Sequence, residues 1–262
     1  NKDKNARQAG FLTLGGLGDS ALDALLALLE DPDQDLRHGA VKTLGMMAEN
    51  RYVGYHLEDT KRATEAILAF FEKGGADTMK FQERIQVLES IKDPRAVRVM
   101  LKALKHKGDW HSKYSGYQDA PQGFLLAFEK MGEYAVDPLI EALGDEDPMI
   151  RTGATSAFSY LQYREEVAKK AAEPLIQALG DKDLKVRASV ARALGAIKDS
   201  RAVEPLIAVL KNKRESQDVR LAAATALRNF KGPNIDAVFR EIKNDRSEDK
   251  EIREVLMSPE EI

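Results

Sequence analysis

Apolar side chains along this chain recur three and four residues apart, in segments that come in pairs. In the clearest pair, the first segment carries Leu175, Ile176, Ala178 and Leu179, and the second carries Val186, Val190, Ala191, Ala193, Leu194 and Ile197. This spacing puts the apolar residues of each segment on one face of an α-helix. A polar turn from Gly180 to Asp183 separates the two segments. The pattern therefore predicts a pair of helices, and we find no sustained alternation that would indicate strands.

The helix pair is repeated along the chain. Three segments that begin at Ala135, Ala171 and Ala202 nearly superimpose, a fourth begins at Ala21, and weaker copies begin at Ala63, Ala96 and Ile235. One pair cannot bury its own apolar face, so neighbouring pairs must stack and share a core. We expect an all-α superhelix of about seven helix pairs in a single domain, 1–262. Its parts are a half repeat at 1–19, repeats at 20–50, 62–92, 93–132, 133–164, 170–198 and 199–231, and a C-terminal cap at 232–262.

Proline and glycine recur at fixed positions of the unit. Pro138, Pro174 and Pro205 share one position, which we place near the start of the first helix, where a missing N–H costs little. In the second helix, Leu-Gly recurs at Leu14-Gly15, Leu44-Gly45 and Leu194-Gly195. Glycine inside a helix costs about 1 kcal/mol relative to alanine. Its repetition predicts a close approach of neighbouring helices at that point.

Charged residues follow the same register. An arginine opens the second helix at Arg7, Arg37, Arg151, Arg187 and Arg220. In three units an aspartate lies six residues earlier, which gives the pairs Asp31 with Arg37, Asp145 with Arg151, and Asp181 with Arg187. We expect these pairs to form a structural ladder that caps the start of the second helix and connects neighbouring units.

These motifs resemble the HEAT repeat, and most closely its short variety found in phycobilisome bilin lyases. The shared pattern is A-V-E-P-L-I-x-x-L followed by D-x-D-x-x-V-R-x-x-A-x-x-A-L-G-x-I, which is strongest from Ala135 to Phe230 and weak at 62–131 and 234–256. The resemblance implies a right-handed α-α superhelix whose second helices line the concave side. It also implies that an aspartate and an arginine six residues apart belong to the family pattern.

Composition narrows the setting of the protein. The chain has 262 residues, a net charge of −3 and no cysteine, so disulfides, zinc–thiolate sites and thiol nucleophiles are excluded. We expect no membrane span, no cofactor and a cytoplasmic location. The segment from Ala6 to Asp19 matches a second helix without its first helix. We therefore expect that the chain continues upstream of Asn1 or that a partner covers this end.

One long insertion holds the unusual residues of the chain. The segment from Lys105 to Asp119 contains Trp110, Tyr114 and Tyr117, which are residue types common at binding hot spots. Four interpretations are open for it: a docking loop, rings that pack back on the helices, a metal site at His106, Asp109 and His111, or a hydrolytic site. The first two fit better, because neither metal-ligand spacing nor a nucleophile–base arrangement is visible.

A basic stripe leads into this loop. Arg95, Arg98 and Lys102 follow steps of three and four residues and share one helical face. The segment 95–113 contains one acid, Asp109. The stripe is either a solvated outer face or a surface for an acidic protein or single-stranded nucleic acid.

The favoured function is a non-catalytic scaffold that presents a curved helical-repeat surface and the aromatic and basic loop to a protein partner. The alternatives are a subunit of a bilin-lyase-like enzyme and a HEAT protein that binds nucleic acid, the latter disfavoured by the acidic pI. Deoxyhypusine hydroxylase, another member class, holds iron through His-Glu dipeptides. None occurs here, because His38, His56, His106 and His111 precede Gly, Leu, Lys and Ser.

Overall fold

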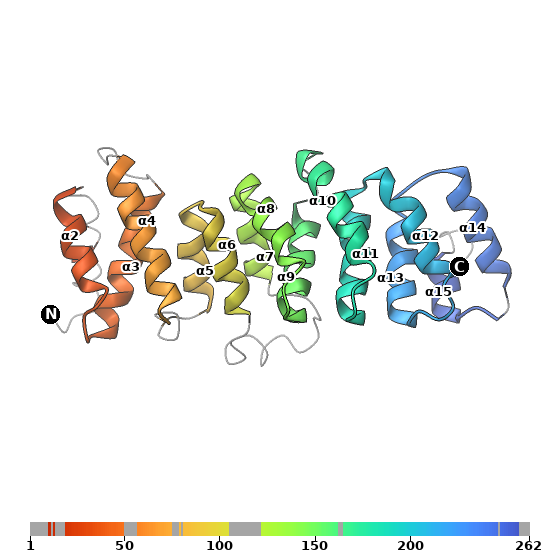
Figure 1. Cartoon of the computed structure of the whole chain (residues 1–262), viewed down its shortest axis with the longest axis horizontal. Helices are drawn as coiled ribbons and strands as arrows, with labels where there is room; N and C mark the ends of the chain where they lie inside the picture. Colours follow the sequence, from red (N-terminus) through yellow and green to blue (C-terminus); the bar gives the residue numbers. More distant parts are fainter. Residues whose placement is uncertain are drawn as a thin grey trace. The chain divides into compact units, whose positions relative to one another are not determined.

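The computed structural model describes residues 10–11, 13, 19–49, 57–74, 79, 81–104, 122–161, 165–245 and 247–256. It divides into two compact units. Unit 1 consists of Asn1–Gly116 with Pro121–Ala135, and unit 2 of Tyr117–Ala120 with Val136–Ile262. The expected all-α repeat fold is confirmed, and the described residues contain no strand (Figure 1). The aromatic loop and most of the half repeat at 1–19 lie outside the described residues.

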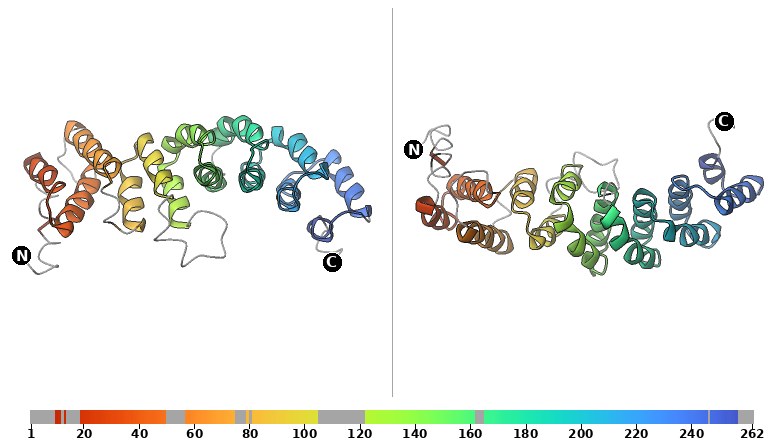
Figure 2. Two further views of the ribbon diagram at one scale, coloured as in Figure 1. Left: turned by 60° about the horizontal axis from the view of Figure 1, so that its bottom comes forward. Right: turned by 90° about the horizontal axis from the view of Figure 1, so that it is seen from above.

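The described residues of unit 1 form three helix pairs. They are α2 (Asp19–Leu28) with α3 (Gln34–Ala48), α4 (Leu57–Glu72) with α5 (Phe81–Ser90), and α6 (Pro94–Ala103) with α7 (Gln122–Met131). The first helices α2, α4 and α6 contact one another in sequence, and so do the second helices α3, α5 and α7. Two layers result (Figure 2). Between them lie fully buried side chains that include Leu25, Leu44, Ile67, Met100 and Phe124.

Unit 2 repeats this two-layer plan. Its helices are α8 (Glu133–Ala142), which begins in unit 1, α9 (Pro148–Tyr160), α10 (Glu165–Ala178), α11 (Leu184–Ile197), α12 (Val203–Lys211), α13 (Gln217–Leu227), α14 (Pro233–Asn244) and α15 (Lys250–Val255). A 3₁₀ turn, η2 (Ser200–Ala202), precedes α12. The second helices α9, α11, α13 and α15 contact one another in order, as the stacking of repeats requires.

The second helices begin at polar N-caps. Asp33, Asp147, Asp183 and Ser216 each accept a hydrogen bond from a backbone N–H of the following turn. Such a bond satisfies one of the N–H groups that have no partner within the helix. These caps fix where each second helix starts, and therefore the register of the residues discussed below.

The placement of two prolines was wrong. Pro138 and Pro174 lie inside α8 and α10, which begin at Glu133 and Glu165. The helices start earlier because buried residues such as Val136 and Val167 precede the prolines and extend the apolar face by one or more turns. Each proline therefore removes a hydrogen bond from within its helix. No helix among the described residues is long and apolar enough to cross a membrane.

Candidate functional site

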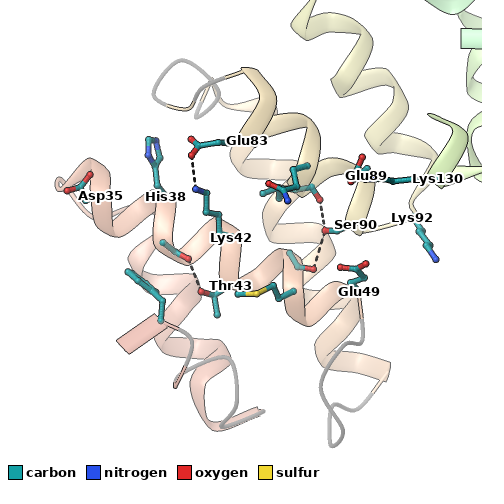
Figure 3. Close-up of a pocket in the computed structure, with 16 residues that line it drawn as sticks. Asp35, His38, Lys42, Thr43, Glu49, Glu83, Glu89, Ser90, Lys92 and Lys130 are labelled. Carbon is teal, nitrogen blue, oxygen red and sulfur yellow. Dashed lines mark hydrogen bonds and ion pairs between the residues drawn. The ribbon is translucent and has the colours of Figure 1, made fainter. Parts of the chain in front are cut away.

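A groove of about 760 Å³ runs along the second helices of unit 1 (Figure 3). Its walls come from α3 and α5, and Lys130 of α7 closes one side. The residues that line it are Phe11, Asp35, His38, Gly39, Lys42, Thr43, Gly45, Met46, Glu49, Glu83, Gln86, Val87, Glu89, Ser90, Lys92 and Lys130. A volume of this size is typical of sites that bury a ligand or several side chains of a partner.

The floor of the groove is uncharged and tightly joined. A methyl group built at Gly45 would lie 3.2 Å from Ser90 Oγ and 3.3 Å from Val87 Cγ1, so α3 and α5 are in close contact at this glycine. The single hydroxyl proton of Ser90 is directed to the carbonyl of Val87 at 2.7 Å and is shared with the carbonyl of Gly45 at 3.2 Å. Met46 is half-buried beside them. The centre of the groove is therefore an uncharged surface where α3 and α5 are closely packed.

Charged side chains stand at both ends of this floor. Lys42 Nζ lies 2.8 Å from Glu83 Oε1 and connects α3 to α5, while Lys130 Nζ lies 2.6 Å from Glu89 Oε1 and connects α7 to α5. Figure 3 shows the two ion pairs on opposite sides of the floor. The groove thus offers both signs of charge around an uncharged centre.

His38 stands at the Lys42 end of the groove. Burial lowers the pKa of this imidazole, and the carboxylate of Glu83 only partly opposes that effect. Since an ordinary histidine pKa is about 6.5, the His38 ring is neutral at pH 7. It can donate and accept one hydrogen bond each.

The phenyl ring of Phe11 lines the groove next to Gly39 of α3. A methyl group at Gly39 would come within 2.1 Å of the Phe11 ring, so only glycine leaves room for the ring in this position. Phe11 belongs to the segment that we interpreted as a second helix without its first helix. Most of that segment lies outside the described residues.

Of the candidates from the sequence, the structure describes the basic residues of α6. Trp110, Tyr114 and Tyr117 lie outside the described residues. Arg95, Arg98 and Lys102 are exposed on α6. Among the residues that the structure describes, no three His, Asp or Glu side chains gather to hold a metal ion.

Arg95 is not an available cation of the stripe. Its Nη2 lies 2.7 Å from Asp93 Oδ2 and 2.8 Å from Glu65 Oε1, and these hydrogen bonds raise the pKa of Arg95 further above its ordinary value. The sequence interpretation counted only Asp109 against the positive charge of this segment. It missed Glu65 because that residue lies 30 positions away on the neighbouring helix α4.

The ladder residues form a regular series in unit 2. Arg151 Nε lies 2.7 Å from Asp181 Oδ2, and Arg187 Nη2 lies 2.7 Å from Glu215 Oε1. Both arginines also donate through Nη1 to the backbone carbonyl of the aspartate six residues earlier, at 2.8 Å for Asp145 and 2.7 Å for Asp181. Each arginine therefore binds a carbonyl of the turn that precedes its own helix, and it also binds a carboxylate of the next helix pair.

The series continues at Arg220, whose partner Glu248 the sequence did not suggest. Arg220 and Glu248 form a buried pair with Nη2 2.5 Å from Oε2. In unit 1, Arg37 Nη1 donates to the carbonyl of Asp31 at 2.6 Å, the same main-chain contact that Arg151 and Arg187 make. Asp31 itself accepts from the backbone N–H of Asp33 at 2.7 Å.

The arginines lower the pKa values of the ladder carboxylates. Hydrogen bonds from Arg187 and Arg220 hold the pKa values of Glu215 and Glu248 below their ordinary range. Burial raises the pKa of Asp181, but hydrogen bonds from Arg151 and from the backbone of Asp183 outweigh it, and the net shift is downward. All three carboxylates are therefore ionised at neutral pH.

We expect unit 2 to lose stability in acid. Because the folded pKa values are lower than the unfolded values of about 4, the contribution of these groups is complete above the unfolded pKa and is lost as pH falls through the folded pKa. The melting temperature should stay level from pH 7 to about pH 5 and fall steeply below about pH 4. Circular dichroism at constant ionic strength measures it, and a rise on acidification would contradict the argument. A variant with Arg220→Met and Glu248→Met should show a shallower fall.

The chain matches a known family. The profile of the family described as HEAT repeats matches residues 1–69, 136–228 and 172–257. No curated protein sequence is significantly similar to the chain.

Solved structures of several repeat proteins are similar in part. Human deoxyhypusine hydroxylase in complex with glycerol is 22% identical with a TM-score of 0.39, covering 98% of this chain and 89% of that one. A designed armadillo repeat protein in complex with the peptide (KR)4 is 16% identical with a TM-score of 0.39, and the match covers 90% of this chain and 96% of that one. Kap121p bound to Nup53p is 13% identical with a TM-score of 0.47, and the match covers 98% of this chain and 36% of that one.

Proposed function

The chain belongs to the HEAT-repeat family, and from this we propose that it is a non-catalytic scaffold that binds a protein partner through the groove of unit 1. The observation that carries the proposal is the groove itself, which three successive second helices build from an uncharged floor between two ion pairs. A helix-pair stack creates such a surface without any added domain.

The groove fits a peptide segment with one apolar side chain flanked by charges of both signs. The apolar side chain would bury against Met46 and Val87, where apolar area removed from water supplies affinity. The flanking charges would meet Lys42 and Glu83 at one end and Glu89 and Lys130 at the other. Such complementary charges set the register of the partner more than they add affinity.

The hydroxyl group in the groove supports binding rather than catalysis. A serine nucleophile needs a base that accepts its proton. The Ser90 hydroxyl instead donates to the carbonyls of Val87 and Gly45, which hold it against the helices. This is the arrangement of a structural side chain, so we assign the groove to recognition.

Site-specific photocrosslinking tests the proposal. A photoreactive side chain at Gln86, which is exposed on the groove, should capture the partner in cells, while the same group at Lys102, exposed on α6, should not. The captured protein is then purified and its affinity measured by titration calorimetry. We expect Met46→Glu to weaken binding by about tenfold or more, because the partner's apolar side chain would bury a charge.

The matched control is Lys102→Glu, which should leave the dissociation constant unchanged. Both variants must retain the helical circular dichroism of the parent protein. Equal capture from Gln86 and Lys102, or an affinity that Met46→Glu does not change, would contradict the groove as the binding surface.

A further inference from the structure

The arginine series of unit 2 reaches the last helix. Arg187 is the fourth residue after the N-cap Asp183, and its backbone N–H donates to the Asp183 carbonyl at 3.1 Å. Arg253 of α15 is likewise the fourth residue after the N-cap Asp249, and its backbone N–H donates to the Asp249 carbonyl at 3.1 Å. Arg253 therefore occupies the position of a ladder arginine.

Among the described residues, Arg253 Nε finds no carboxylate of the kind that Arg151 and Arg187 bind. The Nε atom is buried and has no hydrogen-bond partner in the part of the chain that the structure describes. The same atom of Arg151 donates to Asp181 Oδ2 at 2.7 Å, and that of Arg187 donates to Glu215 Oε2 at 2.8 Å. A buried N–H of a cation without an acceptor is unfavourable, so this position is incomplete in the part of the chain that the structure describes.

The acids near Arg253 are held by other groups. Glu248 binds Arg220, Glu251 accepts from Gln217 Nε2 at 3.2 Å, and Glu254 Oε1 lies 3.5 Å from Lys250 Nζ. These three carboxylates therefore already have partners other than Arg253 Nε. The acceptor must come from outside the described residues.

We propose that α14 and α15 form a docking surface for a helix pair of another polypeptide, whose turn carries Asp or Glu just before its second helix. In the three complete pairs the carboxylate comes from that turn. Asp181 lies two residues before the N-cap Asp183, and Glu215 and Glu248 lie one residue before the N-caps Ser216 and Asp249. The planar guanidinium can donate two parallel hydrogen bonds to a carboxylate, which fixes the orientation of the docked pair. This surface belongs to unit 2 and is independent of the groove in unit 1.

The first test compares Arg253→Met with Arg187→Met in the full chain. Removing the unsatisfied N–H of Arg253 should raise the melting temperature by about 2–4 °C, whereas Arg187→Met should lower it because Glu215 loses its partner. A fall with Arg253→Met similar to that of Arg187→Met would overturn the proposal. If deletion of residues 257–262 lowered the melting temperature as much as Arg253→Met did, Glu260 or Glu261 of the chain itself would be the acceptor.

The second test supplies the missing carboxylate. A copy of residues 228–256 is appended after Glu260, so that the copied Glu248 follows Arg253 by the same 28 residues that separate Arg220 from Glu248. Changing the copied glutamate to glutamine should lower the melting temperature of the extended chain, but not when Arg253 is also methionine. The proposal would be overturned if the two changes altered the melting temperature independently of each other. If the extended chain aggregates, the comparison of Arg253→Met with Arg187→Met still decides.

Discussion

Glu248→Gln is expected to lower the free energy of unfolding by about 3 kcal/mol. The side chains of Arg220 and Glu248 are only 8% and 3% exposed, so the Arg220 cation would lose its counter-charge inside the protein. Arg220 Nε keeps its bond to the Leu210 carbonyl at 2.9 Å, but both Nη atoms lose a carboxylate. Glutamine has nearly the same size as glutamate, so the change isolates the effect of charge. Urea unfolding followed by circular dichroism measures it.

A surface ion pair of the same unit provides the control. Glu241 and Lys211 lie 2.8 Å apart but are 60% and 45% exposed, so Glu241→Gln should cost less than about 1 kcal/mol. The double change Arg220→Met with Glu248→Met should recover much of the loss, because two apolar side chains replace two buried charges. Equal losses for Glu248→Gln and Glu241→Gln would show that burial does not decide the strength of this pair.

The ladder shows what the repeat pattern could predict. The fixed positions of Arg37, Arg151 and Arg187 indicated a structural role, and an aspartate six residues earlier indicated the contact within each turn. The pattern could not tell that each arginine would bind the main chain of that aspartate, nor that the carboxylate of Asp181 would bind Arg151 of the preceding unit. Glu215 and Glu248 were missed because they lie one residue before the N-cap instead of two.

Only part of the groove could be predicted from the sequence. His38, Lys42 and Met46 are each four residues apart, so the sequence predicts that they share one face of the second helix. Their partners could not be predicted, because Lys42 and Glu83 are 41 residues apart and the unit length varies along the chain. Long-range pairs of this kind depend on the register between units, which the weakly matching repeats at 62–131 leave undefined.

Gly195→Ala is expected to lower the free energy of unfolding by about 2 kcal/mol. A methyl group at this position would lie 2.6 Å from Ala226 Cα and 2.7 Å from Ala226 Cβ. These are a backbone atom and the atom attached to it, so α11 and α13 would have to move apart. Forced separation of packed helices typically costs 1–3 kcal/mol and would also stretch the bond from Asn229 Nδ2 to the Gly195 carbonyl, now 3.0 Å. The gain of about 1 kcal/mol in helix propensity offsets only part of this.

Gly45→Ala is the matched control, because Gly45 occupies the same position of the Leu-Gly motif in unit 1. Its added methyl group would meet the side-chain atoms Ser90 Oγ and Val87 Cγ1 at 3.2 and 3.3 Å, while the nearest backbone atom, Val87 Cα, lies at 3.9 Å. These side chains need to shift by only a few tenths of an ångström, so the gain in helix propensity should leave stability within about 0.5 kcal/mol of the parent. Urea unfolding of the two variants shows whether the glycine of the Leu-Gly motif is needed for a backbone contact, as at Gly195, or only meets movable side chains, as at Gly45. Similar losses for both would mean that the glycines serve helix packing equally, and that the backbone contact with Ala226 is not what makes Gly195 indispensable.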